Sequence, residues 1–292
     1  MSKEIIYYYC KSSVFENIIK NKEIWLCDIR KSNDYAEISG IMDEIFDELE
    51  KRIYKDEYLN SLILTGYDNI MHFIKKYWNE TVIQDYLWLA MCFTKAEDDL
   101  SMWRGYTDNG NGFAIGFDKD ALVNAVKKVE YKNSKIADVK YSFDEHQQYV
   151  LQATEKLINS LKEIESEKKH DINISIKSKI KEWYTHSLLE IAYFKKSSFS
   201  VEQEVRLCYF RRVIPFDIKH KKEKTSLNYF DYDIKKNDLV ACLKLHMPEN
   251  LISKIVIGPM NKATPTDVER FLACYGIFDV KCVKSQNTYK GN

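Results

Sequence analysis

Two glutamates and an arginine at alternating positions are the residues of this sequence best suited to chemistry. They are Glu202, Glu204 and Arg206, and the apolar residues Val205 and Leu207 have the opposite parity. Successive side chains of an extended strand face opposite ways, so both carboxylates and the guanidinium are expected on one face. Like charges on one face repel unless a cation lies between them or a ligand uses them, and Arg206 is expected to brace the carboxylates. The pattern therefore predicts either the wall of a polar site or a half-exposed strand whose charges lie in water.

A second candidate begins at Trp103-Arg104-Gly105-Tyr106 and continues through glycines at 110, 112 and 116. Glycines permit close approach of a backbone to a ligand, and equally a hairpin turn followed by a strand that packs against another backbone. No Gly-Lys-Ser/Thr follows, which excludes a phosphate loop, and the glycines fall between a helix and a strand, which excludes a dinucleotide fingerprint.

Three consecutive tyrosines, Tyr7, Tyr8 and Tyr9, open the chain in a short apolar run. On a strand the first and third point one way and Tyr8 points the other. An aromatic side chain beside a polar site stacks on a flat ring or donates a phenolic hydrogen bond, although filling the core is the alternative role. Asn33-Asp34 reads as an Asx turn.

Composition restricts the classes of function. The 292 residues include 44 basic and 44 acidic side chains, so the chain as a whole is not an electrostatic binder of nucleic acid or membranes. Seven cysteines without a C-x-x-C pair indicate reduced thiols in a cytoplasmic protein. The six scattered histidines predict no metal site, and no apolar run approaches the length of a membrane span.

The hydrophobic pattern predicts an α+β fold class, with strands at both ends of the chain and helices inserted between them. Strands are expected at 5–9, 23–27, 86–93, 113–117, 137–142, 201–212, 227–234, 254–258 and 280–283. Helices are expected at 12–20, 35–51, 55–80, 118–128, 143–193 and 265–275. The tail after Gln286 is expected to be loose.

The N-terminal run from Ile6 to Trp25 resembles the opening of DarT-type DNA ADP-ribosyltransferases. Tyr8 stands where that family has His, and Asn21 or Lys22 stands where it has Gly. The whole order is similar to an uncharacterised bacterial family with the pattern Y-x-Y, N-D-x-x-E, W-x-x-Y, G-x-x-I-G-F and E-x-E-x-R. This chain supplies Tyr7 and Tyr9, Asn33 to Glu37, Trp103 and Tyr106, Gly112 to Phe117, and Glu202 to Arg206, so the resemblance extends from about residue 5 to 285.

The resemblance implies one ADP-ribosyltransferase-like domain over residues 1–292, built on a split mixed sheet that binds NAD. Helical insertions are expected at about 35–80 and 143–193. The resemblance gives the catalytic role to Glu204 and a substrate-positioning role to Glu202. Residues expected to contact NAD are Tyr8, Tyr9, Asn33, Trp103, Arg104, Tyr106 and Arg206.

The implied function is that of an NAD-dependent ADP-ribosyltransferase-like enzyme, a toxin or anti-phage defence effector that modifies nucleic acid or protein. An antitoxin or regulatory protein is the expected partner. The Tyr in place of His, and the absence of a Ser-Thr-Ser motif, leave open a non-catalytic module that senses a nucleotide or partner. A third alternative is a metal-dependent nuclease that uses Glu202, Glu204 and Asp34.

Overall fold

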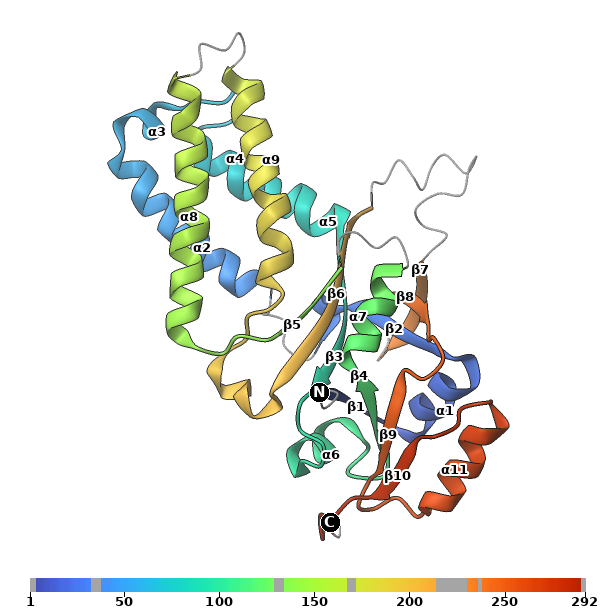
Figure 1. Ribbon diagram of the computed structural model, residues 1–292. Coiled ribbons are helices and arrows are strands. Elements are labelled where there is room, and N and C mark those ends of the chain that lie inside the picture. The colour runs from blue at the N-terminus through green and yellow to red at the C-terminus, as the bar shows by residue number, and fades with distance from the viewer. Residues whose placement is uncertain are drawn as a thin grey trace, which may run out of the picture.

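The computed structural model describes residues 4–32, 38–128, 134–166, 172–213, 230–235 and 238–289 (Figure 1). Ten strands among these residues form one mixed sheet. They are β1 (Ile5–Cys10), β2 (Glu23–Asp28), β3 (Tyr86–Thr94), β4 (Phe113–Asp118), β5 (Ser134–Asp138), β6 (Glu204–Arg212), β7 (Phe230–Lys235), β8 (Asp238–His246), β9 (Ile252–Ile257) and β10 (Lys281–Lys284).

The described helices lie in two places, beside the sheet and in a separate layer at one end of it (Figure 1). Those beside the sheet are α1 (Ser12–Asn21), α6 (Leu100–Tyr106), α7 (Lys119–Lys128) and α11 (Pro265–Cys274). Those of the layer are α2 (Ser39–Lys55), α3 (Glu57–Ser61), α4 (Ile70–Tyr77), α5 (Ile83–Asp85), α8 (Phe143–Ser166) and α9 (Ile172–Ile191).

The sheet divides at β3. One edge of β3 pairs with β6 over the full length of both strands. The other edge meets β1 at Tyr7↔Thr94 and β2 at Cys27↔Ala90, two separate points along the strand. From these points one arm continues as β1-β4-β9-β10 and the other as β2-β8-β7. The sheet is therefore split, and its fork opens between the end of β1 and the strands β2 and β3.

Alternation along β3 and β6 assigns their side chains to two different cores. Leu89 and Leu207 belong to the cluster packed under α1, α7 and α11, whereas Trp88 and Phe210 belong to the cluster of the helical layer. Period-two alternation in each strand produces this separation. Arg206 has the parity of Phe210 and so faces the helical layer, close to the end of α9.

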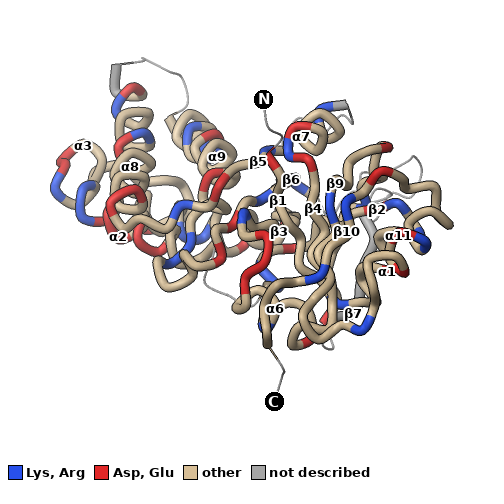
Figure 2. Tube along the Cα trace, turned by 60° about the horizontal axis from the view of Figure 1, so that its bottom comes forward, with Lys and Arg blue, Asp and Glu red and all other residues tan. Residues whose placement is uncertain are grey.

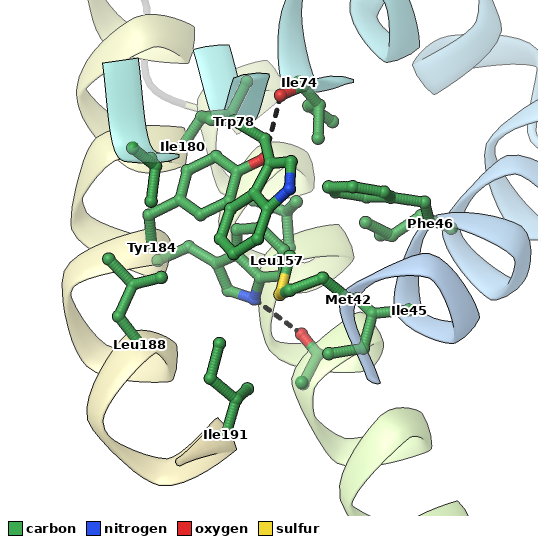
Figure 3. Packing of buried hydrophobic residues seen from close by; sticks show 14 of the residues in the cluster. Met42, Ile45, Phe46, Ile74, Trp78, Leu157, Ile180, Tyr184, Leu188 and Ile191 are labelled. Atoms are coloured by element: carbon green, nitrogen blue, oxygen red, sulfur yellow. Dashed lines mark hydrogen bonds between the residues drawn. The ribbon is translucent and has the colours of Figure 1, made fainter. Parts of the chain in front are cut away.

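The helical layer is built from the two predicted helical stretches, which pack on each other (Figure 1). Helix α8 buries one stripe at spacings of three and four residues, including Val150, Ala153 and Leu157. In Figure 3 the ring of Tyr184 lies among the apolar side chains of this layer, and its hydroxyl donates to the carbonyl oxygen of Ile74 at 2.8 Å. This hydrogen bond satisfies the one polar atom that the ring brings into the core.

The α+β prediction is confirmed, but several elements differ from their predicted bounds; the strand predicted at 137–142, for example, is β5 at Ser134–Asp138. The strand predicted at 201–212 begins only at Glu204, because Ser197–Glu202 forms a 3₁₀ helix. The strand β8 was not predicted at all. Residues 287–289, the described part of the tail predicted to be loose, make hydrogen bonds: Asp98 Oδ1 accepts from Asn287 Nδ2 at 2.9 Å, and Tyr289 Oη donates to Asn109 Oδ1 at 2.7 Å.

Gly112 fixes the end of β1 that carries the tyrosines. A Cβ added to Gly112 would lie 2.0 Å from the carbonyl oxygen of Cys10, whereas one added to Gly105 would meet nothing within 4 Å. Gly112→Ala should therefore lower the free energy of unfolding by about 1–3 kcal/mol. Gly105→Ala, in helix α6, should not lower it. Urea unfolding of both variants checks this expectation, and equal stabilities would contradict it.

Candidate functional site

A cavity of about 480 Å³ occupies the fork of the sheet. Residues of β1, β2 and β3 line it where these strands diverge, among them Tyr8, Tyr9 and Trp25. Glu202, Glu204, Arg206, Lys195 and Tyr106 complete the wall. The size falls within the range usual for small-molecule sites, and aromatic side chains are the usual lining.

Four charged side chains form a cluster in this wall, which we call the carboxylate cluster: Lys195, Glu202, Glu204 and Arg206. Arg206 donates from Nε to Glu204 Oε1 at 2.5 Å and from Nη2 to Glu204 Oε2 at 3.0 Å. Lys195 Nζ donates to Glu202 Oε2 at 2.7 Å and to Glu204 Oε2 at 3.3 Å. The two like charges are thus separated by an ammonium, and the cluster is formally neutral. It is also buried, since the side chains of Arg206 and Glu204 are only 1% and 5% exposed.

The carboxyl group of Glu204 is held in its ionised form. Burial by itself would raise its pKa, but the charge and hydrogen bonds of Arg206 and the charge of Lys195 outweigh burial, so the pKa lies below its usual value. The backbone N–H of Glu204 donates to the hydroxyl of Tyr141 at 2.9 Å. Burial raises the pKa of Tyr141 to about 12, so its phenol stays neutral.

A left-handed residue brings Glu202 into the same wall although it is not part of the strand. Gln203 has φ 43° and joins the 3₁₀ helix to β6. Glu202 Oε1 accepts a hydrogen bond from Tyr106 Oη at 2.9 Å. Burial and the Glu202 charge raise the pKa of Tyr106, so this phenol remains a donor. The two carboxylates therefore converge on the cavity, as expected, but by a different route than alternation along one strand.

The opening tyrosines contribute differently. Tyr8 is half-buried, lines the cavity and packs edge-on against Phe93 with ring centroids 6.3 Å apart. Its hydroxyl makes no hydrogen bond to any residue that the structure describes. Tyr9 is buried, and its hydroxyl donates to the carbonyl oxygen of Ala96 at 3.2 Å and accepts from the N–H of Asp99 at 3.0 Å. Tyr8 thus presents an available phenol, whereas the phenol of Tyr9 is already engaged.

Of the residues expected to contact NAD, Trp103 and Arg104 do not line the cavity, and Asn33 lies outside the described residues. Trp103 does not line the cavity: it is fully buried, its ring packs edge-on against that of Tyr9 with centroids 4.6 Å apart, and its Nε1 donates to Asp98 Oδ1 at 2.6 Å. Arg104 lies on the exposed face of α6, with its guanidinium 5.9 Å from the ring of Tyr289. Helical periodicity separates Arg104 from Tyr106, which lies two residues further along the helix. Asn33 falls outside the described residues, as does Asp34.

Sequence reasoning missed Lys195, the cation that bridges the two carboxylates. Lys195 belongs to no regular helix or strand, and its position depends on a bridge between residues 140 and 194 that brings distant loops together. Periodicity carries no signal for such a residue. The repulsion expected between Glu202 and Glu204 did call for a cation, but it could not say which lysine supplies it.

Within the described residues, no group of three or more His, Cys, Asp or Glu side chains is arranged to hold a metal ion. No helix in those same ranges combines the length and apolar character that crossing a bilayer requires. Figure 2 shows acidic and basic residues interspersed over the helices and the sheet.

Comparison with known proteins yields one finding. No curated protein and no solved structure matches this chain. A family model described as a protein of unknown function (DUF2971) matches residues 102–207, a segment that contains Tyr106 and the whole carboxylate cluster.

Proposed function

We propose that this chain is an NAD-dependent ADP-ribosyltransferase-like enzyme that cleaves the bond between nicotinamide and ribose in the cavity of the fork. The observation that carries the proposal is the convergence of two carboxylates, the Tyr106 phenol and the Tyr8 phenol on one cavity. In the transfer, nicotinamide leaves with the electron pair of the glycosidic bond. An acceptor nucleophile forms the new bond to the ribosyl carbon and loses its proton.

The residues of the cavity fit the demands of that reaction. Cleavage develops positive charge on the ribose, as in glycoside hydrolysis, and a fixed carboxylate hydrogen-bonded to a ribose hydroxyl stabilises this charge. Tyr8 offers an aromatic face and a hydroxyl for the flat nicotinamide ring. Since the carboxylate cluster is buried, its charges act through a medium less polar than water.

The hydrogen bonds favour Glu202 as the carboxylate that contacts the ribose. Both oxygens of Glu204 already accept hydrogen bonds from Arg206, and Lys195 adds a third donor. Glu202 accepts one hydrogen bond at each oxygen, and its side chain is 15% exposed. Because a carboxylate offers about four acceptor positions, Glu202 retains capacity for a ligand. We therefore give Glu202 the contact with substrate and Glu204 the task of fixing Lys195 and Arg206, which reverses the roles implied by the resemblance.

The proposal also covers the acceptor of the ADP-ribosyl group and the biological role of the protein. The resemblance to DarT-type enzymes supports a nucleic-acid or protein acceptor and an effector of a toxin or anti-phage defence system that a protein partner restrains. The neutral charge balance supports an acceptor recognised by shape and specific contacts rather than by a general basic surface.

A non-catalytic module that senses a nucleotide is the second candidate. The observation in its favour is the saturation of Glu204 by Arg206 and Lys195, which is equally suited to a rigid binding wall. The metal-dependent nuclease is disfavoured because the ammonium of Lys195 lies between Glu202 and Glu204, where a shared divalent ion would bind.

NAD cleavage by the purified chain tests the proposed function. We expect nicotinamide release, measured by chromatography, and a decrease of about tenfold in Tyr8→Ala from the lost ring contact. Tyr54→Ala, at an aromatic residue 52% exposed and outside the cavity, is the matched control and should retain full activity. A folded sample that yields no nicotinamide and no ADP-ribosylated product with a broad panel of acceptors would refute the enzymatic assignment.

A further inference from the structure

A second cavity of about 370 Å³ lies on the other side of Lys195 from the first. It is lined by the start of α2, by residues around the start of α8 and by the loop that follows α9, including Ile41, Phe143 and Phe194. Lys195 lines both cavities, so the two share one wall. The second cavity has no part in the proposed ADP-ribosyl transfer.

Part of the lining of the second cavity is aromatic, and one ring nitrogen there lacks a hydrogen-bond partner among the described residues. Phe143 is 72% exposed, an unusual position for a large apolar ring. The ring of His146 lies 5.7 Å from that of Phe194. His146 Nε2 is buried and has no hydrogen-bond partner among the described residues, with the nearest carboxylate oxygen, that of Glu44, at 3.6 Å. A planar ligand would cover the exposed ring of Phe143, and the ring of His146 also lines the cavity.

The lining of the same cavity also includes groups that recognise an anion. Lys196, Ser197 and Ser198 line the cavity in sequence. In the part of the chain that the structure describes, Lys196 forms no ion pair and neither serine hydroxyl forms a hydrogen bond. Ammonium and hydroxyl donors of this kind bind phosphate oxygens.

We propose that the second cavity binds a nucleoside monophosphate, with its base against Phe143 and His146 and its phosphate at Lys196 and the two serines. A nucleoside monophosphate has a planar heteroaromatic base and one phosphate. The base matches the aromatic residues of the cavity, the phosphate matches its lysine and serines, and the volume suits a ligand of this size. Its occupant contacts Tyr141 and Lys195, which hold the backbone and the carboxylate of Glu204. Binding there is therefore coupled to the geometry of the carboxylate cluster.

Isothermal titration of the full chain with AMP, GMP, CMP and UMP tests this proposal. We expect saturable binding of at least one nucleotide and a loss of about tenfold in affinity in Phe143→Ala, because stacking on an aromatic ring is lost. Lys196→Ala should weaken the binding by a similar factor. Both side chains are exposed, so neither substitution should impair folding.

Two control variants keep this result separate from the proposed function. Phe278→Ala removes another exposed ring, 64% exposed and outside the cavity, and should leave the affinity unchanged. Tyr8→Ala alters only the first cavity and should also leave nucleotide binding intact. The proposal is overturned if no nucleotide binds saturably, if Phe143→Ala and Lys196→Ala bind like the wild type, or if Tyr8→Ala abolishes the binding.

Discussion

Replacing Arg206 by methionine should lower the free energy of unfolding by about 3–5 kcal/mol. Arg206 is 1% exposed and donates to both oxygens of Glu204 and, at 2.6 Å, to the carbonyl oxygen of Ala192. Methionine fills a similar volume but leaves the Glu204 carboxylate buried with Lys195 as its remaining cation. The loss of stability should appear as a lower midpoint of urea unfolding, with little change in how steeply the free energy of unfolding falls with urea concentration.

Arg212→Met is the matched control, because Arg212 lies on the same strand and pairs with Asp85 at 2.9 Å. Its side chain is 42% exposed, so its loss should cost less than about 1 kcal/mol. The double variant Glu204→Leu/Arg206→Met should be more stable than Arg206→Met alone, since it leaves no carboxylate unpaired at this position. If Arg206→Met and Arg212→Met were equally stable, the carboxylate cluster would not be the buried network described above.

The pairing of Glu204 with Arg206 also predicts how the free energy of unfolding depends on pH. Because the pKa of Glu204 is lower in the folded than in the unfolded chain, its stabilisation is fully present above the unfolded pKa. It is lost as the pH falls from the ordinary carboxyl range through the lowered folded value. The wild type should therefore lose more stability than Arg206→Met between about pH 6 and pH 3, as urea titrations at each pH would show.

Replacing Glu202 by glutamine should reduce NAD cleavage by about 10²–10⁴-fold while the melting temperature stays nearly unchanged. This expectation rests on the proposed function. Glutamine keeps the size and an acceptor oxygen for Tyr106 but removes the negative charge that stabilises the ribosyl cation. Since Glu202 is less buried than Glu204 and Lys195 retains Glu204, folding should tolerate the change. Nicotinamide release and thermal unfolding measured on the same samples check both parts.

Glu190→Gln is the control for this experiment, because that carboxylate pairs with Lys135 at 2.5 Å and does not line the cavity. It should retain full activity. Full activity in Glu202→Gln together with complete loss in a folded Glu204→Gln would return the catalytic role to Glu204.

The sequence predicted well those features that depend on local periodicity. The runs that became β1, β2 and β3 were identified from apolar residues of strand length. Alternation in β6 correctly separated Val205 and Leu207 from Arg206, because a strand places neighbouring side chains on opposite faces of the sheet. The family resemblance, rather than periodicity, grouped Tyr8, Glu202 and Glu204 in one site, and all three line the first cavity.

Features that depend on irregular backbone or distant contacts were not predicted. Gln203 adopts a left-handed conformation that few residues other than glycine signal, so the start of β6 was placed too early. Lys195 lies in a loop held by tertiary contacts. The tail after Gln286 was expected to be loose as the end of the chain, yet Asp98 accepts a hydrogen bond from Asn287 that hydrophobic patterning does not register.

Because the sheet is forked, the width of the first cavity depends on how the two arms of the sheet are oriented relative to each other. Its walls come from two arms that leave β3 at different points, so a change in the angle between the arms would open or narrow the space between Tyr8 and Trp25. Substitutions at paired residues of β2 and β8 that do not line the cavity, such as Leu26 and Leu243, would then change the size of ligand that the cavity accepts. Selection for new ligands can act on such pairs without altering the charged residues themselves.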